Sequence, residues 1–177
     1  PDGRLEVRPF GPEGPGFALD ENVDQAVEKG LRLPMLLRFP DLLRYRAAQL
    51  RAAFDTAIAE TGYSAGYTPV YPIKVNQQAS VVETLAAAPG MGLEVGSKPE
   101  LIAALAVAPP GGTIVCNGYK DAHYVRLALS AMKLGLRAIL VIEKPGEWPL
   151  IRRQAERMGV DPVLGEIGRA SCRERVC

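Results

Sequence analysis

The sequence has few of the residues that build metal centres and disulfide frameworks. It contains one histidine and three cysteines in 177 residues, and two of those cysteines fall within the last six positions. Cys116 is therefore the only cysteine in the body of the chain. Structural zinc sites use about four clustered cysteine or histidine ligands, and small disulfide scaffolds need several paired cysteines. The composition excludes both classes, and we expect no metal-ligating residue here.

Long apolar runs are also missing. No stretch reaches the roughly 18 consecutive apolar residues of a membrane-spanning helix, and the start, residues 1–4, lacks a secretory signal pattern. Hydrophobic residues make up 47% and charged residues 23% of the chain, a balance typical of globular domains. We therefore expect a cytoplasmic protein with no membrane partner. Because there is no initiator methionine, we also expect the natural N-terminus to lie upstream.

The last segment, residues 166–177, has no apolar period and resembles the translation of a short-read sequencing adapter. We interpret it as a non-native tail and exclude it from fold prediction. Without its three arginines and two glutamates, 18 basic and 18 acidic residues remain, so the formal charge of +1 disappears. A nucleic-acid partner is then not expected. A natural basic tail is the alternative interpretation.

The N-terminal part predicts little regular structure. Residues 1–18 are rich in glycine and proline and predict one short strand, at residues 5–8, followed by a loop. Helices are expected over residues 22–30 and 41–61, the second one capped by Asp41. Spacings of three and four place six apolar side chains on one face of that longer helix: Leu43, Ala47, Leu50, Phe54, Ala57 and Ile58.

From residue 67 onward, apolar strands alternate with helical stretches. Strands are predicted over residues 70–75, 91–95, 113–116 and 137–143, with a fifth from about residue 161. Helices are predicted over residues 79–88, 98–106, 122–134 and 147–158. This repeat indicates a parallel sheet with helical crossovers. An open doubly wound sheet and an eight-stranded barrel both fit it. A barrel needs about 250 residues, so only half would be present, and its exposed strand edge predicts an unstable fragment.

Lys74 is the first candidate site residue. It interrupts the apolar string Tyr-Pro-Ile-Lys-Val-Asn-Gln at residues 71–77, near the expected C-terminal end of a strand. Low-water surroundings there favour a neutral amine, the form that attacks an aldehyde. In barrels the C-terminal strand ends carry the active site. On this physical argument alone, a strand-end lysine that extends into water is the favoured interpretation, and only the flanking sequence reverses it.

Glu94 is the second candidate, at the equivalent end of the next predicted strand. Neighbouring strands lie about 4.8 Å apart, so we expect Glu94 within reach of Lys74. The carboxylate there pairs with the lysine or with a bound cationic group. An ordinary solvated acid at a strand end is the alternative.

Other polar residues have simpler interpretations. Ser97 and Glu100 have the spacing of a capping box and are expected to start a helix, as is Asp121. Cys116 is expected to be a small packed residue rather than a nucleophile. His123 is expected to be exposed in the first turn of a helix.

Three strings closely resemble the biosynthetic arginine decarboxylase family, in order and in spacing. They are residues 71–77, 92–100 and 114–121. Shorter matches occur at residues 32–34, 38–40, 127–129, 133–135 and 140–144. The resemblance covers nearly all of residues 1–165.

The resemblance implies an α/β fold of the alanine racemase type, in which a (β/α)8 barrel binds pyridoxal 5′-phosphate (PLP) beside a β-rich domain. Residues 1–30 would belong to the β-rich domain and residues 31–165 to the first half of the barrel. Lys74 would be the catalytic lysine that carries the cofactor, and Glu94 a supporting acid. The implied reaction converts L-arginine to agmatine and CO2 for polyamine synthesis. Magnesium and a homo-oligomer, dimer or tetramer, are also expected from the family.

Several alternatives remain. A related decarboxylase acting on diaminopimelate or ornithine has the same fold, and a non-catalytic relative would have no need of Lys74. A dinucleotide-binding domain is disfavoured because the turn at residues 76–78 lacks glycine. The run at residues 109–112 likewise lacks the Lys-Ser/Thr of a phosphate loop. The family's phosphate loop lies beyond residue 165, so the chain by itself is expected to be inactive.

Overall fold

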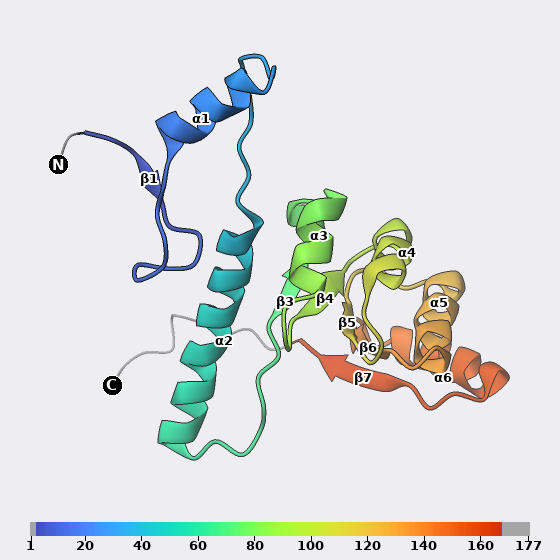
Figure 1. Cartoon of the computed structure of the whole chain (residues 1–177). Coiled ribbons are helices and arrows are strands. Elements are labelled where there is room, and N and C mark those ends of the chain that lie inside the picture. Colours follow the sequence, from blue (N-terminus) through green and yellow to red (C-terminus); the bar gives the residue numbers. More distant parts are fainter. Residues whose placement is uncertain (1–2, 168–177) are drawn as a thin grey trace. The chain divides into compact units, whose positions relative to one another are not determined.

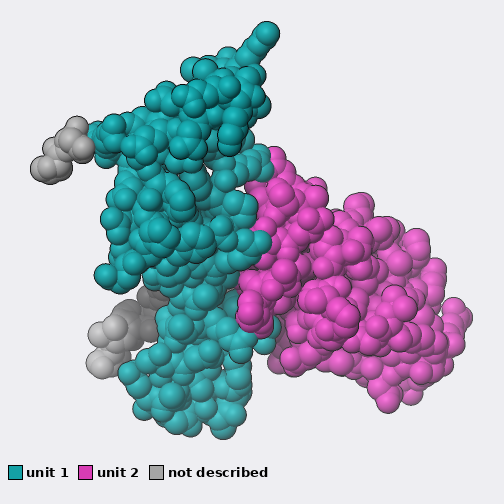
Figure 2. Space-filling view, in the orientation of Figure 1, with its two compact units in different colours: residues 1–69 teal, residues 70–177 magenta. Residues whose placement is uncertain are grey.

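The computed structural model describes residues 3–167. The chain forms two compact units, residues 1–69 and residues 70–177 (Figure 2). This division reflects how the chain packs. It does not test the predicted boundary between a β-rich domain (residues 1–30) and the barrel (residues 31–165), which stays a prediction. Within residues 3–167, no helix is long and apolar enough to cross a membrane.

The first unit contains a two-stranded antiparallel sheet and two helices. Strand β1 (Glu6–Val7) pairs with β2 (Phe17–Ala18), and α1 (Leu19–Glu28) and α2 (Pro40–Thr61) follow (Figure 1). The prediction of a single strand here was incomplete. A two-residue strand such as β2 is too short to give an alternating pattern of apolar and polar residues, so it could not be predicted from the sequence.

Helix α2 starts one residue before its predicted start. Its N-cap is Phe39 and not Asp41, and Pro40 occupies the first turn, where the missing proline N–H costs no hydrogen bond. Along the predicted apolar face only Ala47 is buried. Phe54 on that face stacks on Tyr67, with ring centroids 3.8 Å apart.

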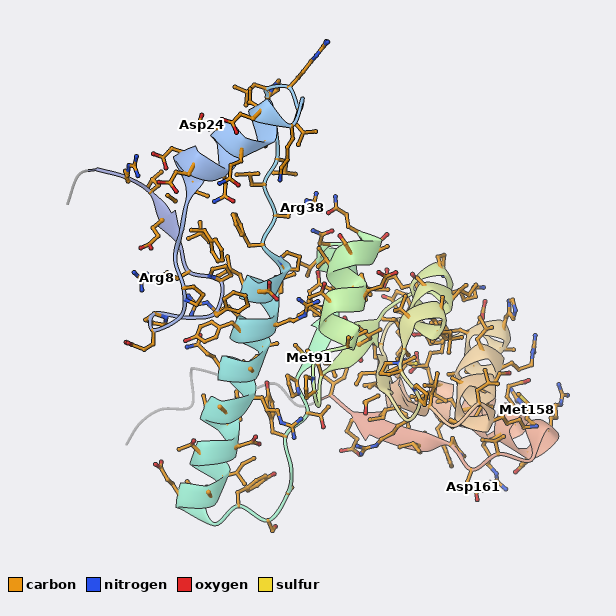
Figure 3. The ribbon with its side chains drawn as sticks, viewed as in Figure 1. Arg8, Asp24, Arg38, Met91, Met158 and Asp161 are labelled. Atoms are coloured by element: carbon orange, nitrogen blue, oxygen red, sulfur yellow. The ribbon has the colours of Figure 1, made fainter. Side chains whose placement is uncertain are left out.

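The second unit alternates strands and helices. Its strands are β3 (Val70–Pro72), β4 (Gly92–Val95), β5 (Thr113–Cys116), β6 (Arg137–Ile142) and β7 (Val163–Glu166). Its helices are the 3-10 turn η1 (Ile73–Val75), α3 (Ala79–Ala86), α4 (Lys98–Val107), α5 (Ala122–Lys133) and α6 (Glu147–Met158). Figure 3 labels Met158, the last residue of α6, and Asp161, which precedes β7. Apart from Glu166 and Ile167, the segment interpreted as a non-native tail lies outside the described residues.

The strand order decides between the two predicted folds. The five strands are parallel and lie in the order β3-β4-β5-β6-β7. A doubly wound sheet reverses its strand order at a switch point, whereas consecutive order without reversal is that of a barrel. Successive helices α3, α4, α5 and α6 also contact one another, which places them in one layer. The predicted α/β class with a parallel sheet is confirmed, and the arrangement is that of part of a barrel.

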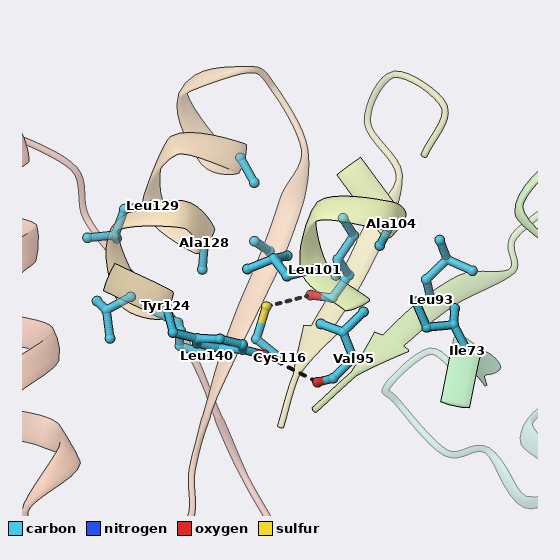
Figure 4. Close-up of a cluster of buried hydrophobic side chains, with 14 of the residues drawn as sticks. Ile73, Leu93, Val95, Leu101, Ala104, Cys116, Tyr124, Ala128, Leu129 and Leu140 are labelled. Carbon is cyan, nitrogen blue, oxygen red and sulfur yellow. Dashed lines mark hydrogen bonds between the residues drawn. The ribbon is translucent and has the colours of Figure 1, made fainter. Parts of the chain in front are cut away.

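The hydrophobic core lies between the sheet and this helical layer. Alternate residues of neighbouring strands supply it, because successive side chains of a strand point to opposite faces. Figure 4 shows the centre of the cluster, which includes Leu93, Val95, Leu101, Cys116, Tyr124, Ala128, Leu129 and Leu140. Cys116 is completely buried there, as predicted for a packed residue, and burial raises the pKa of its thiol to about 12.

This pKa gives a direct chemical prediction. In a Cys172→Ser/Cys177→Ser variant, Cys116 is the only thiol, and iodoacetamide at mildly alkaline pH is expected to leave the folded protein unmodified. The thiolate is the nucleophile, and a raised pKa keeps the thiol protonated at such a pH. Intact-mass spectrometry checks this, with urea-unfolded protein as the reactive control. Fast, stoichiometric labelling of the folded protein would contradict the burial of Cys116.

Candidate active site

A cavity of about 540 Å³ lies in the second unit where its parallel strands end. The residues that line it follow, or end, strands β3 to β7: Lys74, Glu94, Gly96, Glu100, Asn117, Gly118, Tyr119, Glu143 and Ile167. Both candidate site residues therefore line one cavity. It lies at the carboxyl edge of the sheet, the edge that carries the active site in barrels.

Lys74 reaches the cavity from a turn rather than from a strand. Strand pairing ends at Pro72, which has no N–H to continue the ladder, and the next three residues form η1. The predicted strand through Val75 was therefore too long. Lys74 is exposed, so the expectation of low-water surroundings is not met in this chain. The ion pairs formed within residues 3–167 do not include one between Lys74 and Glu94.

Glu94 is held more tightly than Lys74. It pairs in register with Pro72 of β3 and Val115 of β5, so it lies in the middle of a row that crosses the sheet. Its side chain is buried, with 8% of the residue exposed. Asn117 Nδ2 donates a hydrogen bond to Glu94 Oε1 at 2.9 Å. This contact fixes one of the two carboxylate oxygens of Glu94.

Sequence reasoning placed a tight turn at Gly118 after β5 but missed the contacts that this loop makes in the site. Gly118 has a positive φ of 77°, and its N–H donates to Glu143 Oε1 at 2.5 Å. Lys120 Nζ donates to the Gly118 carbonyl at 2.7 Å. The signal in the sequence was positional, since Asn117 and Glu143 both come directly after an apolar strand and Glu94 is the last but one residue of another. Without knowledge of the strand register, these positions gave no reason to predict contacts between the residues.

The helix starts predicted at Ser97 and Asp121 are confirmed. Ser97 Oγ accepts the Glu100 N–H at 3.4 Å, and Glu100 Oε2 accepts the Gly96 N–H at 2.8 Å. The second contact fixes one carboxylate in the cavity lining as a structural group. At α5, Asp121 Oδ1 accepts the Tyr124 N–H at 2.8 Å.

Asp121 also pairs with Lys98 at 2.6 Å. The hydrogen bond from Lys98, followed by the backbone hydrogen bond from Tyr124, lowers the pKa of Asp121 to about 2. The carboxylate therefore stays ionised, and caps its helix, until the solution becomes strongly acidic. His123 beside it is exposed, as predicted.

The lining suits one end of a pyridoxal cofactor. Lys74 supplies a primary amine that can bond to an aldehyde, and Glu94 supplies a fixed negative charge close by. Among the described lining residues Lys74 is the only cation, against three carboxylates. A phosphate group would find no arginine, further lysine or glycine-rich cradle there. These residues fit the aldehyde end of the cofactor, and its phosphate has to be held by other groups.

Within residues 3–167, no group of three or more histidine, cysteine, aspartate or glutamate side chains is placed so that it could hold a metal ion.

Comparison with known proteins agrees with this chemistry. The pyridoxal-binding domain of the pyridoxal-dependent decarboxylases matches residues 47–164. The chain belongs to the pyridoxal-dependent decarboxylase family. Members of this family are carbon–carbon lyases that use PLP, so the predicted cofactor class is confirmed at the level of the family.

Curated relatives within the family are named biosynthetic arginine decarboxylases. Those from Pseudomonas putida and Xylella fastidiosa are 53% identical to this chain, and that from Pseudomonas aeruginosa is 51% identical, each over 165 residues. The matches cover 92% of this chain and 26% of each relative. The chain thus spans about a quarter of the length of these relatives. The predicted family resemblance is confirmed.

A solved structure shows the same fold. The crystal structure of the biosynthetic arginine decarboxylase from Campylobacter jejuni matches with a TM-score of 0.77 and 29% identity. The match covers 93% of this chain and 29% of the Campylobacter chain. The parallel sheet described above therefore corresponds to part of a larger decarboxylase.

Proposed function

We propose that the full-length protein decarboxylates L-arginine to agmatine and CO2, for polyamine synthesis, with PLP bound to Lys74. The observation that carries this proposal is the shared cavity of Lys74 and Glu94 at the carboxyl edge of the sheet, in a domain of a pyridoxal-binding family. Arginine as the substrate is supported by the names of relatives that are 51–53% identical.

The chemistry divides between cofactor and protein. When bound, PLP supplies an aldehyde that bonds to amines and a ring that accepts the electron pair left when CO2 departs. The amine of Lys74, on a flexible four-carbon stem, anchors the cofactor and is free to exchange with the substrate amine. The carboxylate of Glu94, held by Asn117, offers a fixed negative charge to cationic groups in the cavity.

Reductive trapping tests the role of Lys74. Borohydride treatment of the PLP-loaded full-length protein is expected to fix a pyridoxyl group on Lys74 Nζ, because reduction makes a bond between that amine and the cofactor permanent. Peptide mapping by mass spectrometry locates the label, and untreated protein is the control. A label on another lysine would sink the assignment.

Substrate choice is tested separately. CO2 release from L-arginine, L-ornithine and meso-diaminopimelate is measured with the same preparation, and arginine is expected to give the highest kcat/KM. Preference for either of the other two would identify a related decarboxylase. Trapping of PLP on Lys74 without CO2 release from any of them would support a non-catalytic relative.

Glu94→Gln is expected to lower kcat by a smaller factor than loss of Lys74, about 10- to 100-fold. The substitution keeps the size of the side chain and removes its charge. Steady-state kinetics with L-arginine measure the change, and Glu83→Gln on α3 is the control, since Glu83 is exposed and does not line the cavity. An unchanged kcat would show Glu94 to be a bystander.

Magnesium, self-association and location complete the proposal. We infer a cytoplasmic homo-oligomer, dimer or tetramer, from the resemblance of the whole chain to the biosynthetic enzymes. Magnesium is proposed from the same resemblance. CO2 release from L-arginine with and without a chelator tests this requirement, and release is expected to fall when Mg²⁺ is removed.

A further inference from the structure

Both backbone polar groups of Gly118, its N–H and its carbonyl, are hydrogen-bonded to side chains. Glu143 Oε1 accepts its N–H at 2.5 Å, and Lys120 Nζ donates to its carbonyl at 2.7 Å. On the Gly96 side there is no spare room, because a Cβ added to Gly118 would collide with the Gly96 carbonyl. Three loops, after β4, β5 and β6, therefore meet at one residue, Gly118.

A buried ion pair supports this contact. Lys120 Nζ lies 3.5 Å from Glu147 Oε2, and the two side chains are 0% and 7% exposed. The same Glu147 oxygen accepts the Glu143 N–H at 2.9 Å. A buried ion pair costs desolvation that its attraction often fails to repay, so it is weak evidence for stability. Here both members of the pair are connected to Gly118. Lys120 contacts its carbonyl directly, and Glu147 contacts Glu143, which accepts the Gly118 N–H.

That loop presents Asn117 to the cavity. The Asn117 N–H donates to the Val95 carbonyl at 2.8 Å, and the Tyr124 hydroxyl donates to the Asn117 carbonyl at 3.1 Å. The backbone of Asn117 is thereby fixed on both sides, and its carboxamide donates to Glu94 at 2.9 Å. A continuous set of contacts runs from the buried pair to the carboxylate in the site.

We propose that Lys120, Glu147 and Glu143 are positioning residues that hold the Gly118 peptide so that Asn117 orients the Glu94 carboxylate in the cofactor cavity. The inference rests on the proposed function, since it gives the orientation of Glu94 a catalytic consequence. It predicts that loss of any one contact changes the surroundings of the cofactor without removing the cofactor.

The test uses the PLP-loaded full-length protein with Asn117→Ala and Lys120→Met. Each is expected to lower kcat for L-arginine about tenfold or more, with KM changed less than about twofold, because a misplaced catalytic group affects turnover strongly. The visible circular dichroism of the bound cofactor is expected to change in both, whereas the PLP content stays the same. Lys98→Met is the matched control, because it breaks an exposed lysine–aspartate pair outside the cavity lining.

Amide hydrogen exchange gives a readout that needs no activity. In Glu143→Ala, the peptide that spans residues 117–121 is expected to exchange faster, because the Gly118 N–H loses its acceptor. If Lys120→Met does not fold, Asn117→Ala and this exchange experiment still decide the proposal. Asn117→Gln, which keeps the donor on a longer stem, is expected to recover part of the lost kcat.

The two proposals fail in different ways. Wild-type kcat and cofactor dichroism in Asn117→Ala, with PLP still trapped on Lys74, would overturn the positioning role alone. Slow exchange at Gly118 in Glu143→Ala would overturn it as well. Absence of trapping on Lys74 would instead overturn the proposed function.

Discussion

Full-length protein in which alanine replaces Lys74 is expected to lose at least roughly a thousandfold in kcat for L-arginine. Alanine removes the amine that would anchor the cofactor, and no other lysine is found among the described residues that line the cavity. Steady-state CO2 release measures the loss. The absorbance of the bound cofactor should also shift, because the bond between the cofactor and the protein is absent.

Lys133→Ala is the matched control for this experiment. Lys133 is an exposed lysine at the end of α5, in the same unit and outside the cavity, so wild-type kcat and absorbance are expected. A Lys74→Ala variant that decarboxylates arginine at the wild-type rate would rule out Lys74 as the cofactor lysine. Retained PLP with lost turnover would agree with the proposal, because other groups hold the phosphate.

The largest expected effect on stability comes from Gly118→Ala. A non-glycine residue at a positive φ costs about 1–2 kcal/mol, and here the added methyl group would also collide with the Gly96 carbonyl. The colliding atoms of Gly96 are backbone atoms, which cannot move aside as a flexible side chain can. We therefore expect a loss of about 3 kcal/mol or more in the free energy of unfolding. Urea denaturation followed by circular dichroism measures it.

Gly111→Ala separates the two causes. Gly111 has nearly the same positive φ, 74°, but no atom lies within 4 Å of the position that its Cβ would take. Its substitution is expected to cost only the conformational term, about 1 kcal/mol. Equal losses at the two glycines would mean that the close approach of Gly96 and Gly118 does not constrain the loop.

The regular part of the second unit was predictable because its signals are local. An apolar run followed by a helical period identifies each βα unit, and the predicted bounds of β5 and α6 match the structure. Ser97 and Asp121 were predictable as helix caps because capping depends on residues only three positions apart. Proline ended β3 earlier than its apolar pattern suggested, so the surroundings of Lys74 were misjudged.

The supporting contacts of the site were not predictable in the same way. Lys120 and Glu147 are 27 positions apart in the sequence, and their pairing depends on how the loop after β5 packs against the start of α6. Asn117 and Glu94 are brought together by the register of β4 against β5. Register and loop packing are tertiary properties, and charged residues in a loop look alike in a sequence whether they are solvated or buried.

The consecutive strand order also bears on how this protein is made. Paired residues in the sheet are only 21 to 24 positions apart, so each new strand can dock on its predecessor soon after it leaves the ribosome. Each pairing of neighbouring strands closes one βα unit, and chains generally fold from the N-terminus as they are synthesised. The loop at Gly118 can close only when β6 and the start of α6 have emerged, because Glu143 and Glu147 arrive with them. The loop at Gly118 would therefore be completed one βα unit later than its own strand, β5.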